Sequence, residues 1–246
     1  MKFFFKIILK YYLKYITKTV LFLHQPKIVA VCGSINKTFV RDEIVRNFKK
    51  EKKSIRANPK NFNTEIGLPL AILNVSSGYN SYRGWISPII EALKAVFQKK
   101  FPKYLVLEFG ISQKGDMKYL LSIVSPKIFV ITDITQRYVE LFSGMDELFE
   151  EYEYLAEKIS KNDWLVLNYD NIKIRELAKR TLAKVVSFGE QNFSSEWRIA
   201  KIEKNPQGQK VSISYQGKEK KYQLNRFGKH HAFALVASLA VKNIRI

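Results

Sequence analysis

Short apolar runs alternate with helix-like segments along most of the chain, and this alternation restricts the fold more than any other feature. The runs are rich in valine, isoleucine and leucine, and three of them end in glycine. Strands with this continuous apolar character are buried on both faces, as in parallel sheets that helices cover on both sides. We therefore predict an α/β fold with a mostly parallel sheet and helices on both faces. The predicted strands are residues 27–33, 104–110, 127–134, 163–170 and 184–189.

The segments between these strands carry apolar residues at the spacing of amphipathic helices. In residues 88–100, for example, Ile89, Ile90, Leu93, Val96 and Phe97 fall on one face. The predicted helices are residues 39–53, 88–100, 115–124, 145–160, 171–182 and 229–243.

Residues 194–225 have a different pattern, in which short alternating segments are separated by turn residues at 206–208 and 216–217. This pattern predicts a small antiparallel β-subdomain. We predict two units in the chain: residues 1–25 as a basic amphipathic helix, and residues 26–246 as the α/β domain that carries the β-subdomain as an insert.

The first 25 residues place a lysine at every fourth position, from Lys2 to Lys18. On a helix this spacing gives one slowly drifting basic stripe, with aromatic and aliphatic residues over the remaining surface. The lysines disfavour a transmembrane helix and a signal peptide. Two hypotheses remain open: the helix lies on an anionic membrane surface, or it packs on its own domain with a lysine-rich outer face.

The charge balance predicts an anionic partner. The chain has 42 Lys and Arg against 22 Asp and Glu, a formal net charge of +20. Nucleic acid, anionic lipid and a phosphorylated ligand all fit such a charge. One cysteine, Cys32, excludes an intramolecular disulfide framework and a cysteine-cluster zinc site. Recognised nucleic-acid-binding motifs are lacking in the sequence, so a basic nucleic-acid-binding protein is kept only as an alternative.

Residues 29–38, VAVCGSINKT, join a predicted strand to a predicted helix through a glycine turn and a Lys-Thr pair. A phosphate-binding loop has this context, because its backbone N–H groups and lysine face the phosphates while its hydroxyl binds Mg²⁺. The usual pattern would have glycine at Val31 and Asn36. Asparagine tolerates a left-handed backbone, although its side chain would crowd a phosphate. A plain strand–helix connection is the alternative.

Glu108 comes at the end of the strand predicted over residues 104–110. Ligands of α/β proteins bind at the carboxyl ends of parallel strands. Glu108 would therefore be placed to hold Mg²⁺ opposite Thr38. The alternative is an exposed glutamate that caps a nearby turn.

Several segments together resemble the central ATP-binding domain of the Mur ligase family, and within it the branch that adds D-alanyl-D-alanine to the UDP-MurNAc-tripeptide. The resemblance covers about residues 27–243. Its most distinctive part is the asparagine-rich stretch followed by Ile-Gly-Leu-Pro-Leu. The segments are NFNTEIGLPLAIL (61–73), VLEFGISQKGDMKYL (106–120), VITDITQRYVELFSGMDEL (130–148), LVLNYDN (165–171) and GKHHAFALVASLAV (228–241).

The resemblance implies ATP and Mg²⁺ as cofactors and assigns roles to individual residues. Asn63 falls in the loop that approaches the γ-phosphate and the acyl-phosphate, and His230 matches the histidine near the nucleotide. The implied catalytic residues are Lys37 and Asn63; the implied nucleotide contacts are Gly33, Ser34, Asn36, Lys37, Thr38 and His230; the implied metal ligands are Thr38 and Glu108.

Ligases of this family activate a carboxylate with ATP as an acyl-phosphate, which an amine then attacks. The resemblance thus implies a role in peptidoglycan synthesis, with a nucleotide and a UDP-MurNAc-peptide as partners. It also implies a cytoplasmic protein, which the basic helix would hold at the inner face of the membrane.

Several positions depart from the family pattern. Asn36 replaces a glycine, Tyr138 replaces a histidine, and Tyr152 replaces a carbamylated lysine that helps to hold the second Mg²⁺. Tyrosine is a poor Mg²⁺ ligand at neutral pH. The N-terminal sugar-binding and C-terminal domains of the family also have no counterpart here. We therefore expect a degenerate or incomplete Mur-like domain, a pseudoenzyme candidate. The alternative is an active amide ligase that a partner chain completes with the C-terminal domain.

Overall fold

The computed structural model describes residues 3–59, 61–136 and 141–244. The strands are β1 Lys27–Cys32, β2 Ile55–Ala57, β3 Tyr104–Glu108, β4 Ile128–Ile131, β5 Trp164–Asn168, β6 Lys184–Gly189, β7 Trp197–Asn205, β8 Gly208–Tyr215 and β9 Lys218–Leu224. The helices are α1 Phe3–His24, α2 Lys37–Lys50, α3 Gly67–Leu73, the 3-10 turn η1 Arg83–Trp85, α4 Ile86–Ala95, α5 Asp116–Leu121, α6 Met145–Lys158, α7 Ile172–Leu177 and α8 Lys229–Asn243.

Within the described residues the strands form one sheet, in the order β2-β3-β1-β4-β5-β6-β7-β8-β9. Neighbouring strands from β2 to β7 are parallel, whereas β8 and β9 continue the sheet in antiparallel fashion. The predicted α/β class is confirmed, as is the antiparallel pattern near the C-terminal end. Because β7 pairs with β6, the antiparallel strands extend the main sheet, and β2 and β9 form its two edges.

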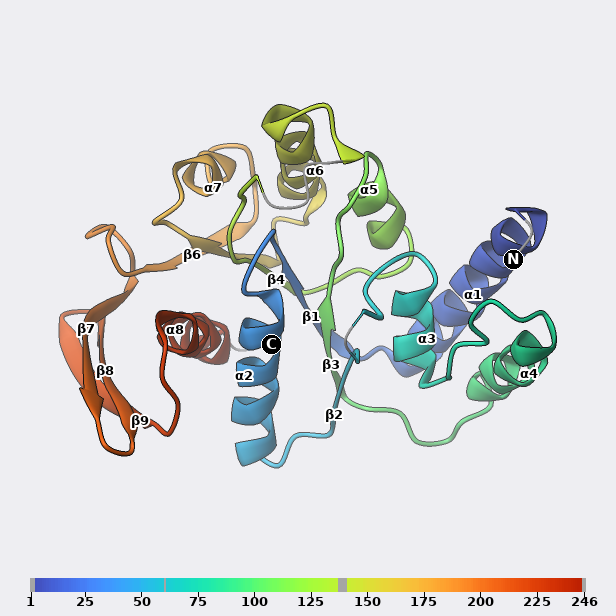
Figure 1. The fold of residues 1–246 in the computed structure, drawn as a ribbon, viewed down its shortest axis with the longest axis horizontal. Helices are drawn as coiled ribbons and strands as arrows, with labels where there is room; N and C mark the ends of the chain where they lie inside the picture. The colour runs from blue at the N-terminus through green and yellow to red at the C-terminus, as the bar shows by residue number, and fades with distance from the viewer. Residues whose placement is uncertain (1–2, 60, 137–140, 245–246) are drawn as a thin grey trace.

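Helices cover both faces of the sheet (Figure 1). Alternation along β1 shows why: Val29 and Val31 join the buried cluster beneath α2 and α8, whereas Ala30 and Cys32 join the cluster beneath α5, α6 and α7. Burial of apolar side chains on both faces explains the continuous apolar runs of the sequence. The strand β2 did not stand out in the sequence, because its three residues are only partly buried and pair with β3 alone.

The N-terminal helix α1 packs against α3 and α4 at one end of the sheet (Figure 1). Its inward side chains, among them Leu9, Leu13 and Val20, share a separate apolar cluster with Trp85 of η1. The Tyr12 hydroxyl donates to the backbone of α4 at 2.8 Å. Within the described residues the structure contains no helix with the length and apolar character that a membrane span needs.

Three lysines of α1 contact other parts of the domain. The Lys6 amine pairs with Glu65 at 3.1 Å, the Lys10 amine lies 3.8 Å from the centre of the Tyr119 ring, and the Lys14 amine donates to Ser122 at 2.7 Å. The helix therefore packs on its own domain, as one of the two hypotheses states, but its outer face is mainly apolar, with Lys18 exposed beside it, where that hypothesis expects a lysine-rich face.

The apolar side chains predicted to share one face in residues 88–100 do not all face the core. Pro88, Ala92 and Ala95 are the buried residues of α4. Leu93 and Phe97, which the pattern grouped with the apolar face, are 50% and 78% exposed. The helix is present, but the larger apolar side chains lie on its outer side.

Replacing Leu13 with alanine tests whether α1 is part of the cooperative fold. The Leu13 side chain is fully buried, so the substitution leaves a cavity. We expect a loss of about 3 kcal/mol in the free energy of unfolding, measured by urea denaturation. Tyr15→Ala, at a position that is 62% exposed on the same helix, is the control and should cost less than about 0.5 kcal/mol. Equal, small effects would show that α1 unfolds independently.

Candidate functional site

The loop after β1 forms the tight turn that a phosphate-binding loop requires. Gly33 has a φ of 135°, and a Cβ at this position would come within 2.8 Å of the Asp133 carbonyl oxygen. Ser34 ties the loop to the segment after β4, because its N–H donates to the Asp133 carbonyl at 2.6 Å. Asn36 precedes α2 with a φ of 64° and a ψ of 0°. Asparagine thus adopts the left-handed conformation that glycine provides in the usual pattern.

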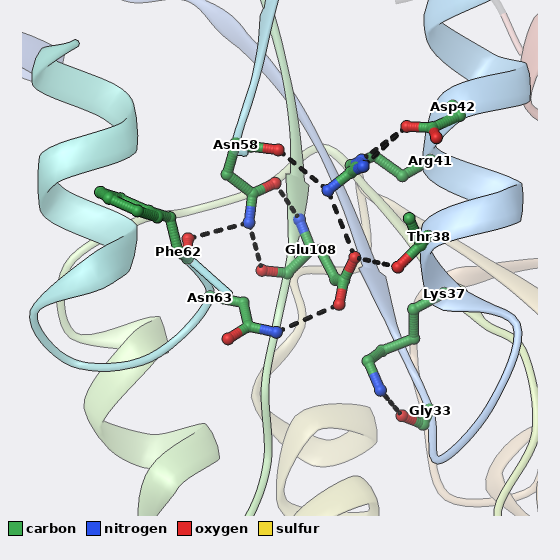
Figure 2. A network of polar contacts seen from close by, with 9 residues as sticks. All are labelled: Gly33, Lys37, Thr38, Arg41, Asp42, Asn58, Phe62, Asn63 and Glu108. Atoms are coloured by element: carbon green, nitrogen blue, oxygen red, sulfur yellow. Dashed lines mark hydrogen bonds and ion pairs between the residues drawn. The ribbon is translucent and has the colours of Figure 1, made fainter. Parts of the chain in front are cut away.

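Thr38 and Glu108 meet at the carboxyl ends of β1 and β3. The Thr38 hydroxyl donates to Glu108 Oε2 at 2.9 Å, and the Asn63 amide donates to Glu108 Oε1 at 3.1 Å (Figure 2). The Glu108 side chain is only 8% exposed. The sheet reverses its strand order around β1, the position at which α/β proteins bind ligands.

Arg41 and Asn58 complete the surroundings of Glu108. The Arg41 guanidinium lies 3.4 Å from Glu108 Oε2 and donates to the Asn58 carbonyl at 2.9 Å. The Asn58 side chain accepts from the Glu108 N–H at 2.8 Å and donates to the Phe62 carbonyl at 2.9 Å. These contacts fasten the segment after β2 to the end of β3, as Figure 2 shows.

Arg41 and Asn58 are absent from the predicted site. A signal for Arg41 existed, because residues three apart on a helix share a face and Arg41 follows Thr38 by three positions. The position of Asn58 depends on a loop conformation that the sequence pattern does not specify.

Lys37 points back onto its own loop. Its amine donates to the Gly33 carbonyl at 2.7 Å and lies 3.4 Å from the Ser34 carbonyl (Figure 2). A lysine held in this way is near the turn that would receive a phosphate. Rotation of its flexible side chain would exchange these carbonyl oxygens for phosphate oxygens.

A cleft of about 620 Å³ lies in front of these groups. It brings together most of the predicted site residues, from the loop after β1, the segment before α3, and the end of β3. Its lining residues are Ser34, Ile35, Asn36, Lys37, Thr38, Phe39, Asn61, Asn63, Thr64, Glu108, Gly110, Ile111, Ser112 and Leu141.

His230 lies at the start of α8 and does not line this cleft. Its ring centre is 4.3 Å from that of Phe39, which does line it. The neighbouring His231 ring is 5.2 Å from Phe39. Partial burial lowers the pKa of His231, and the positive charges of His230, Arg226 and Arg46 lower it further. The histidine pair therefore borders the cleft, because both rings contact Phe39, which lines it.

The two tyrosines that depart from the family pattern are Tyr138 and Tyr152. Tyr138 lies outside the described residues. Tyr152 is buried in α6, where desolvation, the largest cause, raises the pKa of its hydroxyl well above the ordinary value. A neutral, enclosed hydroxyl does not suit a second Mg²⁺.

One Mg²⁺ fits the remaining donor set only in part. Thr38 and Glu108 offer one hydroxyl and one carboxylate, whereas no group of three or more His, Cys, Asp or Glu is placed for a metal within the described residues. Mg²⁺ commonly takes one or two carboxylates together with water and substrate phosphates. The pair therefore suits a metal that arrives with a nucleotide.

The profile of the Mur ligase middle domain matches residues 89–242. The chain belongs to the Mur ligase family. It is 24% identical over 173 residues to the UDP-N-acetylmuramoyl-tripeptide–D-alanyl-D-alanine ligase of Rickettsia prowazekii, an alignment that covers 69% of this chain and 33% of that protein. The ligase of the same name from Buchnera aphidicola is 24% identical over 221 residues, covering 89% of this chain and 43% of that protein.

The fold agrees with this Mur ligase assignment. The MurF ligase of Thermotoga maritima, solved in complex with ADP, superimposes with a TM-score of 0.75 at 22% identity, covering 93% of this chain and 48% of that one. The chain spans about a third of the length of the first curated relatives that it matches, since the alignment covers 33% of the Rickettsia ligase.

Replacing Arg41 with methionine tests the buried ion pair of the site. The substitution leaves Glu108 and the Asn58 carbonyl without their guanidinium partner at a position where the arginine is 6% exposed. We expect a loss of about 2–3 kcal/mol in the free energy of unfolding, measured by urea denaturation. Arg83→Met, at an exposed arginine of η1, is the matched control. A loss below about 1 kcal/mol for Arg41→Met would contradict the pairing.

Proposed function

We propose that this chain is the nucleotide-binding module of a Mur-type ligase and that it binds ATP in the cleft after β1. The observation that carries the proposal is the convergence of Lys37, Thr38, Asn63 and Glu108 on one cleft at the carboxyl ends of β1 and β3. Family membership supports a nucleotide, rather than nucleic acid, as the anionic partner that the charge of +20 predicts.

Each residue has a role that its position supports. Lys37 would turn from the Gly33 carbonyl to the phosphates and neutralise part of their charge. Thr38 and Glu108 would hold one Mg²⁺, which supplies charge neutralisation when bound with the nucleotide. Asn63, now on Glu108, would orient the terminal phosphate from the opposite side of the cleft. His230 would act through Phe39.

The named relatives join D-alanyl-D-alanine to a UDP-N-acetylmuramoyl tripeptide. We propose that this chain retains nucleotide binding from such an enzyme in the cytoplasm, and that its own ligase activity is degenerate. Asn36 in the phosphate loop, the Arg41 cation beside Glu108, and the buried Tyr152 each weaken the site for magnesium and phosphates. The chain would therefore bind ATP without efficient turnover.

An active ligase completed by a partner chain is the second candidate. The contact between Thr38 and Glu108 favours it, since this pair would still offer Mg²⁺ one hydroxyl and one carboxylate. In that case the partner would supply the C-terminal domain, a UDP-MurNAc-peptide would supply the carboxylate, and D-alanyl-D-alanine would supply the amine. Mg²⁺-dependent release of phosphate from ATP in the presence of the peptide, the amine and the partner chain separates the two candidates.

Calorimetry with ATP tests nucleotide binding directly. We expect micromolar affinity in the presence of Mg²⁺ and a roughly tenfold to hundredfold loss in Lys37→Ala, because a charge-assisted contact to phosphate is removed. Lys49→Ala, at an exposed position in the last turn of α2, should bind like the unmodified chain. Glu108→Gln should remove the benefit of Mg²⁺, so that its affinity for ATP is the same with and without the metal. Absence of binding at millimolar ATP would refute the proposal.

Replacing Asn36 with glycine tests the cost of the unusual phosphate loop. The φ of 64° at this position suits glycine without strain, and removal of the side chain gives a phosphate more room. We expect ATP affinity to rise about tenfold in the same calorimetric assay. Asn74→Gly, at a second left-handed asparagine with a φ of 60° after α3, is the control and should leave affinity unchanged. Weaker binding in Asn36→Gly would mean that the asparagine itself contacts the nucleotide.

A further inference from the structure

Two neighbouring helices at one end of the sheet expose large apolar side chains at regular helical spacing. On α1 the exposed residues recur every three or four positions from Phe4 to Tyr15, and Phe22 follows seven positions later on the same side. Along α4 and just beyond its end they also recur every three or four positions, the spacing of one helix face. We call these residues together the apolar face. They are Phe4 (78% exposed), Ile8 (68%), Tyr11 (49%), Tyr15 (62%) and Phe22 (76%) on α1, and Ile86 (59%), Ile90 (49%) and Leu93 (50%) on α4, with Phe97 (78%) just after its end.

The two stripes belong to helices that are joined to each other. On each helix the exposed stripe lies opposite the buried residues, and both helices pack on the same apolar cluster with α3. The helices are joined by the bond from Tyr12 to the Ile89 carbonyl and by an edge contact between the Phe5 and Tyr82 rings, 5.1 Å apart. Figure 1 shows α1 and α4 at the end of the molecule farthest from β7, β8 and β9.

Positive charge surrounds this apolar face. Residues 1–25 contain no Asp or Glu. Near α4, the exposed charged residues are Arg83, Glu91, Lys94, Lys99 and Lys100. The border of the face is therefore strongly basic, with a single carboxylate on α4, whose oxygen accepts from Ser87 at 2.8 Å.

A basic hollow of about 380 Å³ lies between α1 and α5. Lys10, Lys14 and Lys118 line it, and Asp116 is occupied by the N–H groups of residues 112 and 113. Burial lowers the pKa of Lys14, and the charges of Lys18 and Lys10 lower it further. An anion in this hollow would relieve the repulsion among these lysines.

We propose that the apolar face docks on an anionic lipid membrane. The aliphatic and aromatic side chains of α1 and α4 would lie at the boundary between headgroups and acyl chains, and exposed lysines beside them, such as Lys18 and Lys94, would contact lipid phosphates. Amphipathic helices that rest on membranes combine these features: apolar residues with aromatic rings on one side, and lysine or arginine beside them.

Other occupants fit the charges less well. A second copy would bring two lysine-bordered surfaces together with few acids to balance them, and like charges repel. The buried centres of protein interfaces are depleted in lysine, whereas membrane interfaces favour it beside aromatic residues. The apolar face is a different surface from the nucleotide cleft, so membrane docking would not depend on ATP binding.

Vesicle sedimentation tests the proposal with the 246-residue chain. One set of vesicles is pure phosphatidylcholine, and the other contains about 30% phosphatidylglycerol, which gives the surface a negative potential. The test variant combines Ile8→Ser, Ile90→Ser and Phe97→Ser on the apolar face. The control combines Leu182→Ser and Phe193→Ser, which remove apolar side chains that are 85% and 83% exposed away from α1 and α4.

We expect binding to the anionic vesicles that falls at least about tenfold in the test variant and is unchanged in the control, with both variants folded by circular dichroism. Failure of the unmodified chain to bind would overturn the proposal. So would binding that is equal in both variants and lost in high salt, since that is adsorption through net charge. Concentration-dependent dimerisation that the test variant abolishes, without vesicle binding, would assign the face to a second copy.

Discussion

The Glu108 carboxylate sits at the end of β3 with little access to solvent, and a buried charge must have partners close to it. Arg41 and Thr38 reach it from α2, and Asn63 reaches it from the segment before α3. Each of these segments is distant in sequence, so the carboxylate determines how they meet. The cleft has its shape because those segments converge on one charge.

The same arrangement links stability to the chemistry proposed for the site. A guanidinium that balances Glu108 stabilises the cleft without a metal, yet it also competes with a metal for the same oxygen. Arg41, Asn36 and Tyr152 are therefore the residues on which the proposed loss of turnover depends.

Much of the fold could be predicted from the sequence, because continuous apolar runs such as residues 104–108 indicate strands that are buried on both faces of a sheet. The site was predicted in outline for a similar reason: Lys37, Thr38 and Glu108 follow strands that end at one edge of the sheet. Arg41 and Asn58 were not predicted, since their contacts depend on loop geometry. The four-residue spacing of lysines in α1 predicted a basic stripe, but it did not predict which side of the helix would face the domain. The long aliphatic stem of a lysine can pack against the protein, as Lys10 does against the Tyr119 ring, while aromatic side chains of the same helix face outward.

The two edge strands bear on how this protein behaves at high concentration. An exposed strand edge offers unpaired backbone groups to another chain, which is a common route to aggregation. At one edge, β2 has only three residues. At the other edge, β9 carries Lys218, Lys220 and Lys221 in exposed positions. A short edge and a charged edge both oppose the addition of a further strand, so both ends of this sheet are protected against pairing with another chain.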